Sequence, residues 1–120
     1  MEVEHRPADS EAAESLATDV EVATSAFGQG RGLMFRRSFP DGSALVMPFD
    51  RVRRRSLHSF FVFFPFEAIW VDGETVTRIH RFEPFRSIAA ARADLLVELP
   101  TGVAESVSPG DRLRLTEEQG

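Results

Sequence analysis

One apolar stretch in the middle of the chain limits what this protein can fold into. Segment 56–72, SLHSFFVFFPFEAIWVD, holds five of the eleven Phe residues and the only Trp. Pro65 and Glu67 interrupt it well before it reaches the roughly 18 apolar residues that a membrane span needs. Because proline cannot donate to a central β-ladder, Pro65 predicts two strands, 57–64 and 66–71. The rest of the chain must then supply the elements that cover these strands.

Short segments with strand-like composition recur along the rest of the sequence, and turn-forming residues such as the Pro-Asp-Gly at 40–42 separate them. The other predicted strands are 2–6, 16–23, 44–49, 74–82, 94–99 and 112–115. The predicted connections are short helices at 25–34 and 103–107, a loop at 51–55 and an irregular segment at 83–92. About seven short strands without long helical connections predict a mainly β single domain, either an antiparallel β-sandwich or a distorted barrel with one or two short helices.

The length of 120 residues suits one domain with its own core. We expect residues 1–15 to form a short strand and a polar acidic segment that is partly flexible. Residues 16–115 should form the single β-rich domain, and 116–120 a frayed tail.

Missing residue types exclude several kinds of chemistry. The chain has no Cys, which excludes disulfides, thiolate metal sites and thiol nucleophiles. All fourteen basic residues are Arg, so Schiff-base and P-loop lysine mechanisms are excluded as well. This acidic, lysine-free composition is typical of a GC-rich genome and compatible with a halophile. No metal site and no cofactor are predicted.

The charge is unevenly distributed. The net charge is −5, which argues against a nucleic-acid partner. Residues 1–25 carry −6, whereas residues 31–55 carry +5. The N-terminus lacks the apolar region of a secretory signal, so we expect a cytoplasmic protein without a membrane partner.

Three motifs resemble a known family. RGLMFR at 31–36 is followed by a Pro-Asp-Gly turn and an apolar strand, FPFEAIWVD occupies 64–72, and ADLLVELP at 93–100 precedes a Gly-Asp turn. Over residues 16–115 the chain resembles the domain of unknown function 192 family, the uncharacterised ACR group. The resemblance implies a compact β-rich fold and no particular activity. Many members carry W-M-K-N-T before the proline, whereas this chain has HSFFV at 58–62 and therefore lacks that Lys and Asn.

Glu67 is the leading candidate for a functional acid, because a carboxylate in an aromatic strand is costly unless it is paired. One interpretation is a structural ion pair with Arg31 or Arg36. The other is a carboxyl with a raised pKa in a pocket. His58 precedes Glu67 in the same predicted strand system, and the two could form an acid–base pair.

The arginines beside the glycine-rich turn complete the predicted site. Arg31, Arg36 and Arg37 could bind a carboxylate or phosphate in bidentate fashion, or they could neutralise Glu67 and the acidic N-terminal half. The predicted ligand-binding residues are Arg31, Met34, Arg36, His58 and Glu67.

Two classes of function remain open. The first is a binding or accessory module with an Arg/Glu/His-rimmed site for a small anionic or polar ligand, or for a protein partner. The alternative is a small hydrolase-like enzyme with Glu67 and His58 as acid–base pair and Arg31 and Arg36 as anion clamp. So many Phe residues cannot all fit one side of a small core, so the aromatic stretch could also be an exposed protein-interaction face that forms a homodimer.

Overall fold

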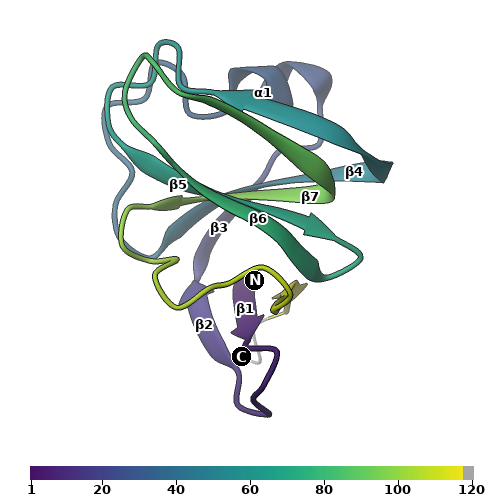
Figure 1. The fold of residues 1–120 in the computed structure, drawn as a ribbon. Coiled ribbons are helices and arrows are strands. Elements are labelled where there is room, and N and C mark those ends of the chain that lie inside the picture. The colour runs from purple at the N-terminus through teal and green to yellow at the C-terminus, as the bar shows by residue number, and fades with distance from the viewer. Residues whose placement is uncertain (118–120) are drawn as a thin grey trace.

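Eight strands form one open, curled sheet in the computed structural model, which describes residues 1–117 (Figure 1). The elements are β1 (Glu2–Arg6), β2 (Glu14–Ala17), β3 (Asp19–Val22), α1 (Ala26–Arg31), β4 (Ser43–His58), β5 (Phe66–Asp72), β6 (Thr75–Phe82), β7 (Ile88–Pro100) and β8 (Arg112–Thr116). The strand order is β2-β1-β8-β6-β5-β7-β4-β3, and within the described part only the β3–β4 pair is parallel. The predicted mainly β class is confirmed; β2 and β3 are the edges of the sheet, so it does not close into a barrel.

Two long strands, β4 and β7, replace elements that the sequence predicts as loop or helix. The basic segment 51–55 lies inside β4, and the Ala-rich part of 83–92 belongs to β7. The ladder from Arg53↔Ala93 to His58↔Ile88 pairs the two. These predictions were wrong because tertiary pairing overrides local propensity: β7 pairs with the basic segment, and Arg55 lies over the Phe49 ring at 3.9 Å instead of in a solvated loop.

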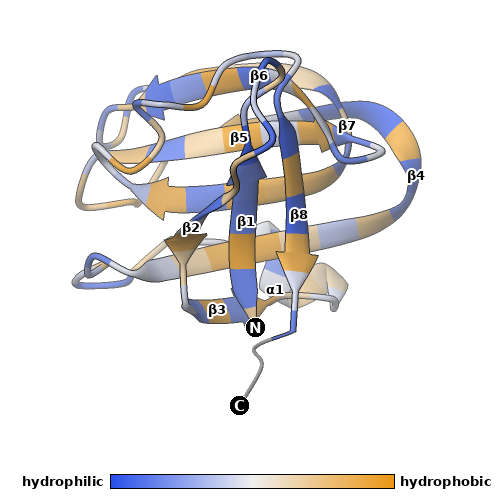
Figure 2. Cartoon of the chain, turned by 90° about the horizontal axis from the view of Figure 1, so that it is seen from below, coloured by the Kyte–Doolittle hydropathy of each residue, from blue (hydrophilic) through white to orange (hydrophobic). Residues whose placement is uncertain are grey.

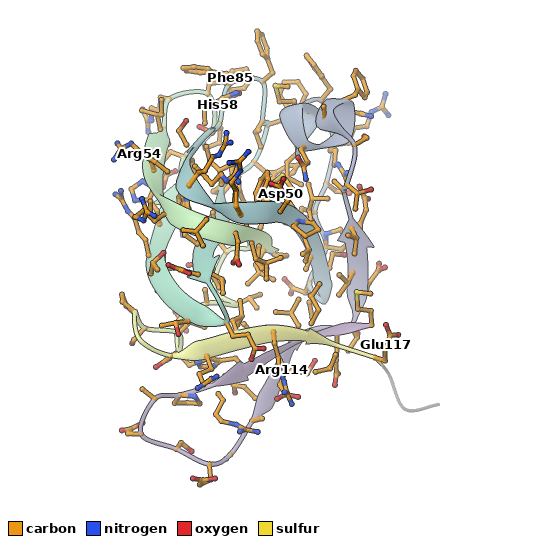
Figure 3. All side chains as sticks on the ribbon, turned by 90° about the vertical axis from the view of Figure 1, so that its right-hand side faces the viewer. Asp50, Arg54, His58, Phe85, Arg114 and Glu117 are labelled. Atoms are coloured by element: carbon orange, nitrogen blue, oxygen red, sulfur yellow. The ribbon has the colours of Figure 1, made fainter. Side chains whose placement is uncertain are left out.

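The predicted strand 57–64 is also wrong. β4 ends at His58, and residues 59–65 form a loop. The buried Ser59 hydroxyl donates to the carbonyl of Glu83 and accepts from the N–H of Ser87. These bonds hold the β4–β5 and β6–β7 loops together at the end of the molecule where Figure 3 shows Phe85 and His58.

The remaining predictions differ from the structure in detail. The predicted strand 16–23 is divided between β2 and β3, and 103–107 is a turn rather than a helix. The strand at 2–6 is present as β1, and α1 lies within the predicted helix. The predicted frayed tail lies, from residue 118 on, outside the described residues.

The sheet buries a separate core on each of its faces. We call the first the aliphatic core; its largest members include Val3, Ile69, Leu99 and Leu113. We call the second the aromatic core; it includes Phe66, Trp70, Phe82 and Leu96. β5 contributes alternate residues to each, as the two-residue period of a strand requires. Figure 2 shows the same alternation on β1 and β8, whose inward side chains reach the aliphatic core.

Candidate ligand-binding site

A hollow of about 150 Å³ lies beside the aromatic core, between α1 with the residues that follow it, the end of β4, and β7. Its apolar lining includes Leu33, Met34, Leu57 and Val62. Its polar side chains include Gln29, Arg31, His58 and Glu98. The RGLMFR motif thus supplies one wall, and the curl of β4 brings a second wall against it.

Glu98 is the unusual residue of this hollow. Its neighbours across the sheet are Leu45 on β4 and Ala68 on β5, both in the aromatic core. The side chain is only 2% exposed, and its carboxyl has no hydrogen-bond partner in residues 1–117. Burial raises the pKa of Glu98 to about 8, and the positive charge of Arg36 only partly opposes this. At neutral pH the carboxyl is therefore mainly protonated and can both donate and accept a hydrogen bond.

α1 is anchored so that its C-terminal end closes over Glu98. The Ser25 hydroxyl caps the helix by accepting from the N–H of Gly28 at 2.9 Å. The Gln29 amide donates to the Pro48 carbonyl of β4 at 2.9 Å. The helix ends at Gly32, whose φ is +51°, and a Cβ there would lie 3.4 Å from Oε1 of Glu98. Glycine is thus required for the backbone conformation, and the carboxyl packs directly against it.

Three predicted residues line the hollow: Arg31, Met34 and His58. Arg31 is exposed and its Nε donates to the Met34 carbonyl at 3.4 Å. It forms no ion pair in contact with a carboxylate among the described residues, but its charge helps to lower the pKa of Glu21. Nδ1 of His58 accepts from the N–H of Phe60 at 3.2 Å, and the two rings stack. In the neutral imidazole this leaves Nε2 as the protonated nitrogen, available as a donor.

Arg36 lies outside the lining but acts on it at a distance. Its guanidinium forms a bidentate pair with Glu21, at 3.1 and 2.6 Å. That pair holds the pKa of Glu21 below its usual value. The remaining field of Arg36 reaches Glu98 through the protein.

The structure does not place Glu67 in the hollow that three other predicted residues line. Glu67 lies on the other face of β5, and its Oε1 accepts from the N–H of Ala104 at 3.2 Å. It forms no ion pair with Arg31 or Arg36, and no hydrogen bond or ion pair joins it to His58 among the described residues. Beyond His58 the chain forms a loop instead of the predicted strand, so no strand register relates His58 to Glu67.

Glu98 was missed, although its sequence signal was the same as that of Glu67. Each is a carboxylate within an apolar strand segment, FEAIWV for Glu67 and DLLVEL for Glu98. Alternation alone does not say which face of a strand meets a hollow and which meets a hydrogen-bonding turn. Only the pairing of β7 with β4 and β5 decides this.

A second buried cluster joins the two ends of the chain. The His5 ring, with no exposed surface, contacts Glu14 at 3.0 Å through Nδ1 and Asp111 at 2.8 Å through Nε2. The Asp111 carboxylate also accepts from the backbone N–H groups of Ala8 and Ser108. Burial alone would raise the pKa of Asp111, but these hydrogen bonds outweigh it and lower the pKa. We call these three side chains the His5 cluster.

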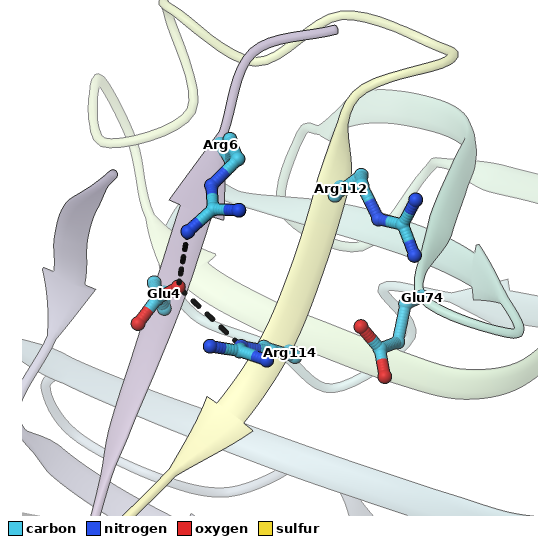
Figure 4. A pocket seen from close by; sticks show the side chains of 5 residues that line it. All are labelled: Glu4, Arg6, Glu74, Arg112 and Arg114. Atoms are coloured by element: carbon cyan, nitrogen blue, oxygen red, sulfur yellow. Dashed lines mark ion pairs between the residues drawn. The ribbon is translucent and has the colours of Figure 1, made fainter. Parts of the chain in front are cut away.

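Another hollow, on the outer side of β1 and β8, is lined by Glu4, Arg6, Glu74, Arg112 and Arg114 (Figure 4). Glu4 forms ion pairs with Arg114 at 3.4 Å and with Arg6 at 3.8 Å. These side chains form a surface ladder of mixed charge. Within it, Nε of Arg6 is buried and has no hydrogen-bond partner among the described residues. Within residues 1–117, no three His, Asp or Glu side chains are arranged to hold a metal ion.

The fold defines a class: a small mainly β domain with an open curled sheet and a hollow beside its short helix. Comparison with known proteins identifies the family. The model of the DUF192 family, described as Uncharacterized ACR, matches residues 8–115, so the chain belongs to this family and the predicted resemblance is confirmed. UPF0127 protein PH1112 of Pyrococcus horikoshii is 29% identical over 100 residues, which are 80% of this chain and 86% of that protein.

Two crystal structures share the fold. One is a Sinorhizobium meliloti protein described as "a putative transcription regulator", with a TM-score of 0.82 and 24% identity over 94% of this chain and 92% of that one. The other is a Novosphingobium aromaticivorans protein of unknown function, with a TM-score of 0.83 and 19% identity over 96% of this chain and 84% of that one. At these identities the likeness concerns the fold alone. In the described part of the chain, no helix has the length and apolar character needed to cross a bilayer.

Proposed function

We propose that this protein is a binding module that holds a small oxyanion, a carboxylate in the simplest case, in the hollow above Glu98. The observation that carries this proposal is the buried Glu98 carboxyl, which has no partner and borders an open hollow. Its oxygens are not among the sealed, unpartnered side-chain atoms of the described residues, so they are open to a partner in the hollow. A ligand that accepts a hydrogen bond from the carboxyl would supply that partner.

The lining suits an oxyanion. The protonated Glu98 carboxyl, Nε2–H of His58 and the Arg31 guanidinium can all donate, and a carboxylate has acceptor sites for all three. The apolar residues Leu33 and Val62 would contact the carbon atoms of the ligand. An apolar cavity of ~150 Å³ accommodates benzene, so a head group of about that size fits.

The proposal predicts how binding depends on pH. An anion requires the protonated form of Glu98, so the affinity should fall as pH rises through about 8. The charge of Arg36 acts on Glu98, and the other charged or titratable residues that line the hollow are Arg31 and His58. The two arginines stay charged over this pH range. A His58→Gln variant removes the imidazole, so any pH dependence that remains in the variant comes from the Glu98 carboxyl.

Titration with sodium acetate, followed by backbone amide NMR, tests the proposal. We expect shifts confined to residues around Glu98, with about millimolar affinity because acetate has few atoms. The affinity should weaken about tenfold per pH unit above pH 8. Glu98→Gln should keep acetate binding but remove this pH dependence, because the amide always donates.

Glu67→Gln provides the matched control, because it makes the same change on the opposite face of β5 and should leave the pH profile as it is. If neither acetate, formate nor inorganic phosphate shifts residues around Glu98 at tens of millimolar, the proposed function is wrong. The predicted cytoplasmic location remains a prediction.

A further inference from the structure

We infer that the ligand is amphipathic: a carboxylate with a linear hydrocarbon tail, whose head lies at Glu98 and whose tail lies in an apolar groove between α1 and Phe35. This inference rests on the proposed function, because it names the class of ligand for the same site. It comes from a second hollow that adjoins the first.

The two hollows share part of their lining. The groove, of about 390 Å³, is lined by Ala26, Phe27, Gly30, Arg31, Met34 and Phe35. Gly30, Arg31 and Met34 also line the hollow over Glu98. In the inferred complex the ligand passes over these shared residues, from the hollow over Glu98 into the groove.

The groove has the character of a site for a hydrocarbon chain. Phe27 and Phe35 are 79% and 57% exposed, unusually high for large apolar side chains. Arg31 is the only charged residue in its lining. Since Arg31 lies where the groove meets the hollow, the charged head belongs at that end and the tail runs along α1.

Phe35 is held at the edge of the groove by a strained backbone. Its φ is +66°, a left-handed conformation that is unfavourable for a residue with a β-carbon. Its N–H donates to the Phe61 carbonyl at 2.9 Å, and the two rings stack at 5.4 Å. The loop thus keeps an aromatic ring exposed beside Arg31 instead of relaxing, which is typical of binding surfaces.

The exposed arginines near the groove argue against a second copy of the chain as its occupant. Arg31, Arg37 and Arg86 are exposed, and no carboxylate among the described residues pairs with them. All three lie in or next to the segments that carry exposed Phe residues. Two copies meeting through this end would bring these like charges together, whereas an anionic amphiphile would neutralise Arg31.

A series of carboxylates with increasing chain length tests the inference. Affinities of acetate, butyrate, hexanoate and octanoate are compared by calorimetry or amide NMR. Each methylene placed in the groove should strengthen binding by about twofold to fourfold, so octanoate should bind far more tightly than acetate. 1-Octanol, with the same tail and no anionic head, should bind much more weakly than octanoate.

Two matched variants locate the tail. Phe35→Gly removes the ring and relieves the strained backbone; it should abolish the gain with chain length but leave acetate binding unchanged. Phe85→Gly is the control, since Phe85 is also exposed, at 47%, has a φ of +67° and lies in neither hollow. It should leave the whole series unchanged.

The outcomes separate the two proposals. If acetate binds at Glu98 but octanoate binds no more tightly, the amphipathic ligand is ruled out and the proposed function stands. If no carboxylate binds, the proposed function itself fails. Equal binding of octanol and octanoate would overturn the inference, because the groove would not select an anion. So would sedimentation showing a dimer that Phe35→Gly converts to monomer, because a second copy would then occupy the groove.

Discussion

The His5 cluster and the Glu98 hollow each contain a buried carboxyl group, but the two groups differ in their hydrogen bonds and in the direction of their pKa shift. Asp111 is 5% exposed and Glu98 2% exposed. Asp111 accepts hydrogen bonds from His5 and from two backbone N–H groups, whereas Glu98 accepts none from residues 1–117. Burial raises the pKa of both groups, but only for Asp111 do hydrogen bonds reverse the direction.

This difference distinguishes a structural carboxylate from one that is available for binding. The His5 cluster joins β1, the start of β2 and the turn before β8, and its acceptors are occupied by protein donors. Glu98 is at least as buried and has no such donors, although it borders the hollow. Burial and a shifted pKa do not by themselves indicate function; the missing partner does.

The largest expected effect comes from removing the carboxylate of the His5 cluster. Asp111→Ala should lower the free energy of unfolding at pH 7 by about 3–5 kcal/mol, because it leaves His5 and two N–H groups buried without their acceptor. Urea denaturation measures this. Glu14→Gln, at the more exposed end of the cluster, should cost roughly 1 kcal/mol. Equal losses in the two variants would show that the burial of Asp111 is not what matters.

Glu98→Gln should have the opposite sign and stabilise the protein. Below about pH 4.5 the carboxyl is protonated in both the folded and the unfolded state, so the variant gains nothing. Between 4.5 and about 8 only the unfolded state loses the proton, so wild-type stability falls relative to the variant. The gain should be on the order of 3 kcal/mol at pH 7 and roughly 5 above pH 8. Thermal or urea unfolding across pH measures the gap, and a constant gap would contradict the raised pKa.

The two regions should also respond differently to acid. The pKa of Asp111 is lowered in the folded state, so the stability it contributes is present above its ordinary pKa and is lost as pH falls through the lower folded value. Asp111→Asn should therefore flatten the loss of stability below about pH 4. Glu98→Gln should leave that part of the curve unchanged. Acid titration followed by circular dichroism compares the two, and an unchanged acid limb in Asp111→Asn would contradict the assignment.

The smallest expected effect comes from Arg36, which pairs with Glu21 on the surface and whose charge acts on Glu98 in the hollow. Arg36→Gln removes a positive charge that lowers the pKa of Glu98, so that pKa should rise further. The loss of the exposed pair with Glu21 should change stability by less than about 1 kcal/mol. Carboxyl NMR of Glu98 measures the shift. Arg37→Gln is the control, and an equal shift in that variant would mean that net charge rather than Arg36 is responsible.

Part of the fold could be read from local chemistry. The hairpin at Asp72 and Gly73, the strand at 66–71 and the short helix after Ser25 follow from turn, alternation and capping preferences, which act over a few residues. Arg31, Met34 and His58 were also predicted to lie in one site, and they do line one hollow.

Other features depend on contacts between distant segments. The basic segment 51–55 is a strand because β7 satisfies its backbone, and HSFFV is a loop because Ser59 joins it to the β6–β7 loop. Neither partner is close in sequence, so no local pattern indicates the pairing.

The sequence by itself determined a mainly β family member without thiol or lysine chemistry, with alternating apolar strands and a polar RGLMFR motif. Tertiary structure alone decided which of two carboxylates borders the hollow. Glu67 and Glu98 have the same chemistry and similar neighbours, but one faces the N–H of Ala104 and the other an open hollow. The physical reason is that burial and hydrogen bonding depend on what the opposite strands and loops bring to each face of the sheet.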